Sequence, residues 1–315
     1  MSEALGLLQG RIKPPPDWPC AQFSESILVA GVRWHYQRIK HEEASNNPSN
    51  NAALLATKTA EQPKLLLLHG TGASTHSWAP LVAQLRDHWD CLLVDLPGHG
   101  FSSGFVAGVP TLPRIASALS ELLSALAFQP RVIGGHSAGA AIAVQMALGH
   151  CECRSLVSIN GAFLPFGSVA APIFSKAAGW LAKARLFQQT TALHGYFRRP
   201  ITKLLEETGS HPNEQMIRAY QLLMRRPEHI RGTLQMMAAW DLQQLKSQLG
   251  TLSTPIELVV CANDKTVSPW QSQRLAELVV NARLTEIPRL GHLGHEEQPN
   301  RFLGIFERLN AASKR

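Results

Sequence analysis

The sequence lacks any apolar run long enough to span a bilayer, and Met1–Pro19 lacks the apolar centre of a secretory signal peptide. We therefore expect a cytoplasmic protein without a transmembrane segment. Cysteines are few: the chain has five, an odd and scattered set that does not suggest a disulfide framework. Cys91 and Cys261 fall in apolar, strand-like runs, where a thiol usually packs as a small hydrophobic side chain.

Charged residues are also sparse, at 17% of 315 residues, and acidic residues are the scarcer kind. The formal net charge is +7, and most of the excess lies between Phe163 and Gly250, where eleven Lys and Arg face five Asp and Glu. Such a segment would favour an anionic ligand, an acidic protein surface or a lipid headgroup layer. A solvated helical face, whose cationic side chains cover apolar surface, explains the charge equally well.

Complete nucleotide-binding motifs are missing. Gly134–Gly139 has the spacing of a phosphate loop without the Lys and Ser/Thr that should follow, and Gly70-Thr71-Gly72 lacks the third glycine of a dinucleotide fingerprint. His292 and His295 have His-x-x-His spacing, but no third ligand stands at a suitable distance along the chain. We expect a small-molecule substrate, with no metal, no cofactor and no nucleic-acid partner.

The most informative stretch present is Arg131–Gly149, in which a β-branched run meets GGHSAG and then a run of small residues. This pattern predicts a strand, a sharp turn and a helix, with Ser137 in strained backbone geometry at the turn. Gly135 and Gly139 stand where a Cβ would collide with the neighbouring strand or helix. The pattern is typical of a serine nucleophile, although a glycine-rich turn with a buried serine would share it.

Alternating strand and helix patterns predict an α/β fold with a mostly parallel, doubly wound sheet. A mobile segment, 1–22, would precede a core formed by residues 23–161 and 251–315. Residues 162–250 read as almost entirely helical, which predicts a lid inserted over the carboxyl ends of the strands. An Asn-rich stretch, 41–62, reads as a surface loop or as an insertion in a hairpin predicted just before it.

A serine nucleophile needs a base, and the base needs an acid that orients it. Asp264 follows one predicted strand and His292 follows the next, so the chain order is Ser137, Asp264, His292. His295 is the competing base and Asp241 the competing acid. The other position for an acid holds Asn160, which cannot act as a carboxylate.

The expected oxyanion hole consists of the backbone N–H groups of Thr71 and Ala138, with Gly72 as the alternative to Thr71. Histidines in positions such as those of His69 and His136 more often bond the backbone than act as catalysts, although both could lie beside the substrate. Four of the six methionines lie in the expected lid, where a soft apolar wall ringed by cations would suit a large, flat ligand with carboxylates. The residues expected around the substrate are His69, Gly70, Gly72, His136, Met236, Trp240 and His295.

Longer motifs carry a more specific resemblance. HGTGASTHSW, DLPGHGFS, GGHSAGAAIA, NGAFLPFG, MMAAWDL and LGHLGHEEQP resemble the BchO-type magnesium-chelatase accessory proteins of bacteriochlorophyll biosynthesis, and the likeness runs from Trp18 to Phe306. The resemblance implies the α/β-hydrolase fold and a catalytic triad of Ser137, Asp264 and His292. It also implies a role alongside the enzyme that inserts Mg²⁺ into protoporphyrin IX, with magnesium chelatase subunits as partners.

Three hypotheses follow for the function. The first is a serine hydrolase that acts on an ester or acyl bond of a tetrapyrrole or a small metabolite. The second is a non-catalytic partner that binds porphyrin or delivers it to the chelatase. The third is a generic carboxylesterase unrelated to pigments.

Overall fold

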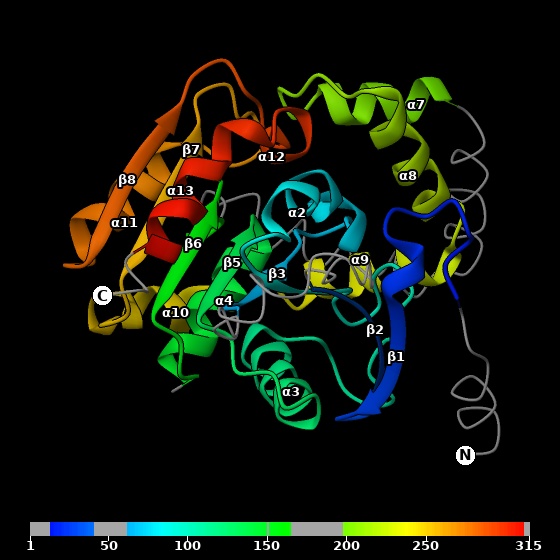
Figure 1. The fold of residues 1–315 in the computed structure, drawn as a ribbon, viewed down its shortest axis with the longest axis horizontal. Helices are drawn as coiled ribbons and strands as arrows, with labels where there is room; N and C mark the ends of the chain where they lie inside the picture. Colours follow the sequence, from blue (N-terminus) through cyan, green and yellow to red (C-terminus); the bar gives the residue numbers. More distant parts are fainter. Residues whose placement is uncertain (1–12, 41–61, 150, 165–197, 312–315) are drawn as a thin grey trace, which may run out of the picture.

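The computed structural model describes residues 13–40, 62–149, 151–164 and 198–311. Within these ranges the strands form one sheet in the order β1-β2-β4-β3-β5-β6-β7-β8 (Figure 1). The strands are β1 (Ser24–Val29), β2 (Val32–Ile39), β3 (Lys64–Leu68), β4 (Asp90–Val94), β5 (Val132–His136), β6 (Ser155–Ile159), β7 (Ile256–Cys261) and β8 (Ala282–Ile287).

The sheet is mostly parallel, as the sequence predicts. Strands β4, β3, β5, β6, β7 and β8 pair in parallel, whereas β1 pairs antiparallel with β2, and β2 with β4. Ala30 and Gly31 join β1 to β2 with φ angles of 53° and 71°, the left-handed conformation that a two-residue hairpin turn requires. Because the carboxyl ends of parallel strands meet at one edge, the loops after β3, β5, β7 and β8 gather there.

Helices cover both faces of the sheet, and the alternation of strand side chains decides what each face buries. Leu66 and Leu68 pack with helices α3, α4, α10 and α11 on one face. Leu65 and Leu67 pack with α2 and α13 on the other. The helices are α2 (Ala79–Leu85), α3 (Leu112–Ala125), α4 (Ala138–Leu148), α10 (Gln243–Gln248), α11 (Trp270–Leu278), α12 (Gly294–Glu297) and α13 (Asn300–Ala311), with short 3-10 turns η1 (Ala21–Phe23) and η4 (Thr75–Trp78).

Residues 198–251, called the cap below, are mostly helical, with non-helical linkers between the helices, and they lie between β6 and β7 in the chain. Asn213 begins the second cap helix by accepting the N–H of Met216 at 3.0 Å, and Pro227 is the first residue of the third. The cap contains α7 (Arg198–Glu206), α8 (Glu214–Met224), α9 (Pro227–Ala238), α10 and the turn η5 (Leu249–Thr251).

The cap packs onto the core through apolar contacts. Trp18 is 3% exposed and shares a cluster with Phe101 of the core and with Ala219 and Leu223 of α8. Helices α7 and α8 stand together at the upper right of Figure 1. No helix among the described residues is long and apolar enough to cross a membrane. The expected mobile segment up to residue 12, the Asn-rich stretch 41–61 and the first part of the lid, 165–197, lie outside the described residues.

Candidate active site

Ser137 occupies the turn between β5, which ends at His136, and α4, which begins at Ala138. Its backbone has φ 52° and ψ −116°, a conformation that a non-glycine residue adopts only when the surroundings enforce it. A Cβ at Gly139 would lie 2.2 Å from the carbonyl oxygen of Leu68, and one at Gly135 would lie 2.4 Å from the carbonyl carbon of Gly139. The two glycines therefore allow strand and helix to approach closely enough for this turn.

Asp264 and His292 meet, although 28 positions separate them in the chain. Oδ2 of Asp264 lies 2.7 Å from Nδ1 of His292, and the two side chains are 0% and 7% exposed. Oδ1 of Asp264 accepts the backbone N–H groups of Thr266 at 2.7 Å and Val267 at 2.9 Å. Oδ1 thus fixes the carboxylate to the backbone of its own loop, and Oδ2 faces the imidazole of His292.

His292 is tied to the Ser137 turn through its backbone. Its carbonyl oxygen accepts Nε2–H of His136 at 2.9 Å and Nδ2–H of Asn160 at 2.9 Å. The rings of His136 and His292 lie 4.5 Å apart between centroids. Asn160 also accepts the N–H of Cys261 at 2.8 Å through Oδ1, so its side chain joins the ends of β6 and β7 to the His292 loop. Sequence reasoning treated Asn160 only as a missing acid and did not find this role.

The Thr71 N–H belongs to a tight turn after β3. The N–H of Ala73 donates to the carbonyl of Gly70 at 3.2 Å, and Gly72 has φ 79°, so the four residues form a β-turn with glycine at its third position. Ala138 is the first residue of α4, and the first N–H groups of a helix have no acceptor within it. The roles of these two N–H groups remain predictions.

Within the described part of the chain, His295 and Asp241, the competing base and acid, lack the paired contact that joins His292 to Asp264. His295 is 0% exposed, lies against the tilted rings of His136 and Trp78 at centroid distances of 4.4 and 4.7 Å, and has no hydrogen-bond partner among the described residues. Burial, with a smaller effect from His292, lowers the pKa of His295 to about 3. Asp241 is exposed, and its Oδ1 accepts the N–H of Gln243 at 2.9 Å at the start of α10.

The other expected substrate contacts make structural bonds or pack in the interior. Nε2 of His69 accepts the N–H of Leu96 at 2.9 Å, so its proton is on Nδ1, which donates to the carbonyl of Gly70 at 2.8 Å. Burial lowers the pKa of His136 well below its usual value. Met236 is 0% exposed within the core cluster, and Trp240 packs against that cluster. Contact with a substrate stays a prediction for these residues.

The linker between α7 and α8 contacts both the Asp264 loop and the His292 loop. The carbonyl of Thr208 accepts the N–H of Lys265 at 3.1 Å and that of His292 at 3.3 Å. Oγ of Ser210 accepts the N–H of Leu293 at 2.9 Å, and Ser210 is 1% exposed. One segment of the cap therefore holds the two loops that carry the acid and the base, which the sequence did not reveal.

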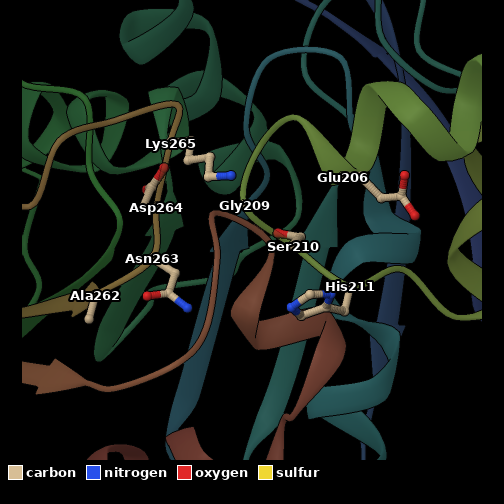
Figure 2. A pocket seen from close by; sticks show the side chains of 8 residues that line it. All are labelled: Glu206, Gly209, Ser210, His211, Ala262, Asn263, Asp264 and Lys265. Atoms are coloured by element: carbon tan, nitrogen blue, oxygen red, sulfur yellow. The ribbon is translucent and has the colours of Figure 1, made fainter.

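A pocket of about 540 Å³ lies beside this linker. Figure 2 shows the linker passing next to the segment from Ala262 to Lys265, with Asp264 at its edge. The carboxylate of Asp264 has no exposed surface, so the pocket borders its backbone and not the face that bonds His292. The lining residues are Glu206, Gly209, Ser210, His211, Ala262, Asn263, Asp264 and Lys265.

A second cap contact is polar and buried. Tyr220 of α8 donates its hydroxyl to Oε1 of Glu296 at 2.9 Å, while Oε2 lies 4.0 Å from Nε2 of His76. Burial raises the pKa of Glu296 to about 8 and lowers that of His76 to about 3. Both shifts favour the neutral groups, so this contact is not an ion pair near neutral pH.

Comparison with known proteins agrees with this fold. The profile of the Alpha/beta hydrolase family matches residues 65–305. The chain is 36% identical to the magnesium-chelatase 30 kDa subunit of Rhodobacter capsulatus, over 93% of this chain and 96% of that protein. It is 29% identical to the pimeloyl-[acyl-carrier protein] methyl ester esterase of Stenotrophomonas maltophilia, over 76% and 91%. An alpha/beta hydrolase fold protein from Burkholderia ambifaria shares the fold, with a TM-score of 0.71, 18% identity and coverage of 90% and 97%.

Proposed function

Since the chain belongs to the alpha/beta hydrolase family, we propose that it is a serine hydrolase acting on an ester or related acyl bond. Ser137 is the nucleophile, His292 the base and Asp264 the acid that orients the base. The observation that carries the proposal is the 2.7 Å contact between Asp264 Oδ2 and His292 Nδ1, in a loop bonded to the residue before Ser137.

The reaction would proceed in two acyl-transfer steps. With its Nδ1–H donated to Asp264, neutral His292 has its lone pair on Nε2 and can take the proton of the Ser137 hydroxyl. The serine oxygen then attacks the carbonyl carbon, and the N–H groups of Thr71 and Ala138 stabilise the oxyanion. His292 returns the proton to the departing alcohol, and a water activated in the same way releases the acid and restores Ser137.

The names of the relatives support ester hydrolysis and suggest a role alongside magnesium chelatase. Pimeloyl-[acyl-carrier protein] methyl ester esterases match across three quarters of the chain, at 29% identity for the protein cited above. The magnesium-chelatase 30 kDa subunit matches across nearly all of it. We therefore assign the protein to work alongside magnesium chelatase, with a tetrapyrrole carboxylate ester as the substrate class.

Labelling with a fluorophosphonate probe tests the nucleophile. We expect one adduct on Ser137 in the folded protein, with none in Ser137→Ala, and hydrolysis of p-nitrophenyl butyrate that Asp264→Asn slows by about 10⁴-fold, as in other triads. An unlabelled Ser137 in folded wild-type protein would overturn the hydrolase proposal.

A second candidate, a non-catalytic partner of the chelatase that binds porphyrin, is favoured by the identity to the chelatase subunit alone. Magnesium insertion in cells that carry only Ser137→Ala separates the two. Unchanged pigment synthesis, together with saturable binding of protoporphyrin IX, would favour the binding partner. Loss of synthesis by a folded Ser137→Ala variant would favour the hydrolase.

A further inference from the structure

We propose that His229, in cap helix α9, is a positioning residue that holds the turn carrying the Thr71 N–H. The inference rests on the proposed function, because it gives the cap a part in forming the oxyanion hole. His229 is 1% exposed and lies far in sequence from every residue of the triad.

The two ring nitrogens of His229 bond two loops of the core. Nδ1 accepts the N–H of Gly100 at 3.0 Å, and a backbone N–H can only donate. The proton of the neutral imidazole is therefore on Nε2, which lies 3.2 Å from the carbonyl oxygen of Gly72 and donates to it. Burial lowers the pKa of His229 to about 4, which agrees with a neutral ring.

The carbonyl that His229 holds belongs to the turn Gly70–Ala73. At the other end of the turn, the Gly70 carbonyl accepts from His69 Nδ1 at 2.8 Å and from the Ala73 N–H at 3.2 Å. A trans peptide group is planar and its C=O and N–H point in opposite directions, so fixing the Gly70 carbonyl fixes the direction of the Thr71 N–H. One imidazole from the core and one from the cap thus brace the two ends of this turn.

Close backbone packing holds α9 in place for this contact. A Cβ on Gly232 would lie 2.1 Å from the carbonyl oxygen of Gly98, so helix and loop touch without an intervening side chain. Since both nitrogens of His229 are engaged, the ring has no site left for exchanging a proton with a substrate. The geometry points to positioning and excludes a direct part in proton transfer.

Two substitutions separate the two hydrogen bonds. In His229→Gln the side-chain amide can reach the place of Nε2 and donate to Gly72, but no acceptor remains for Gly100. In His229→Asn the shorter side chain can place its oxygen near Nδ1 and accept from Gly100, but it does not reach Gly72. Thr233→Val is the matched control, because Thr233 faces Gly72 one turn further along α9 and its hydroxyl has no partner among the described residues.

The readouts are kcat and KM for p-nitrophenyl butyrate, and hydrogen exchange of the segment 70–73. Loss of an oxyanion donor lowers kcat by about 10²–10³. For a donor that is present but less firmly held, we expect a smaller loss, about tenfold, in His229→Asn, with KM little changed and faster exchange at Ala73. His229→Gln should recover most of the rate and protection, and Thr233→Val should match the wild type.

Three outcomes would overturn the inference. The first is that His229→Asn keeps the kcat and the hydrogen exchange of the wild type. The second is that His229→Asn and His229→Gln lose kcat equally and in proportion to their melting temperatures, and the third is that only KM rises. If the wild-type protein hydrolyses no ester and resists the fluorophosphonate, the proposed function fails. Exchange at Ala73 then still decides whether His229 holds the turn, since that measurement requires no turnover.

Discussion

Ser137 and the Asp264–His292 pair are held by different parts of the molecule. Around Ser137 the sheet and α4 meet so closely that a Cβ at Gly139 would lie 2.2 Å from a carbonyl oxygen of β3. The acid and base stand on loops at the end of the sheet, next to exposed residues, and the cap linker supplies acceptors for both loops through Thr208. The nucleophile is thus fixed by the core alone, whereas the loops of its partners are held by the core and by the cap linker.

The turn at Ser137 and the two loops also differ in how far they can move. A turn packed between strand and helix has no room to shift without breaking the main core cluster, so its geometry should persist as long as the fold does. The loops held by three hydrogen bonds from the cap linker can open separately, because such contacts are locally weaker than the core. Catalysis should therefore be lost before the fold when the cap is perturbed.

Alanine at Gly139 should have the largest effect. The new Cβ collides with strand backbone that cannot move, so we expect a loss of about 3 kcal/mol or more in unfolding free energy, measured by urea denaturation. Gly104→Ala is the control, because nothing lies within 4 Å of a Cβ there. A folded Gly139→Ala protein of normal stability would contradict the tight packing.

Alanine at Gly209 tests whether the cap linker holds the Asp264 loop. Gly209 has φ 84°, and a Cβ there would lie 2.0 Å from the carbonyl oxygen of Asn263, beside Asp264. The left-handed conformation alone costs about 1–2 kcal/mol for alanine. We expect a modest drop in melting temperature with a large fall in the fluorophosphonate labelling rate of Ser137. Gly250→Ala, in open space within the cap, should change neither. If both substitutions change the labelling rate of Ser137 equally little, the linker does not hold the site more than the rest of the cap does.

Removal of the Ser210 hydroxyl should act more mildly. Ser210→Ala leaves the N–H of Leu293 without its acceptor in a buried place, which costs about 1–3 kcal/mol. We expect a lower kcat with a smaller change in global stability, measured by ester hydrolysis and thermal unfolding. Ser247→Ala, which removes an exposed hydroxyl of α10 bonded to its own helix, is the control and should behave as wild type. If the two variants have the same kcat, the linker does not hold the His292 loop.

The buried Glu296 connects the cap to the base loop and should make stability depend on pH. Its folded pKa of about 8 lies above its ordinary value of 4.5, so the folded protein keeps a proton that the unfolded chain releases. Unfolding free energy should therefore fall as pH rises from about 4.5 to about 8, by up to about 1.4 kcal/mol per pH unit. Buried neutral histidines such as His76 act in the opposite sense below pH 6.5. The difference between wild type and Glu296→Gln isolates the glutamate, and a difference independent of pH would contradict its burial as an acid.

Substitution on the outer face of the cap should have the smallest effect. Lys203 and Glu207 lie 3.9 Å apart on exposed helix surface, and such pairs contribute within about 0.5 kcal/mol. Lys203→Ala should leave stability and ester hydrolysis unchanged. A large loss of hydrolysis would show that the outer charges of the cap act on the site.

Sequence patterns anticipated the parts that depend on side-chain type. Apolar runs predicted the strands, GGHSAG predicted the turn at Ser137, and chain order predicted that Asp264 would meet His292. The contacts of Thr208 and of the Gly72 carbonyl were not foreseeable, because every residue has a carbonyl and only the fold decides what it faces. The position of Asn160 was noted, but its bonds to two loops depend on how β6 and β7 lie side by side.

The shared acceptor at Thr208 sets a condition for redesigning this protein. Exchange of the cap for that of another family member is an obvious way to change substrate preference, since the sheet would stay intact. A foreign cap that lacks a main-chain oxygen at this place would leave the N–H groups of Lys265 and His292 to water. Such a hybrid would keep its sheet but hold the acid and base loops less firmly, so we expect slow turnover, and grafts should be joined outside residues 208–210 and keep that segment.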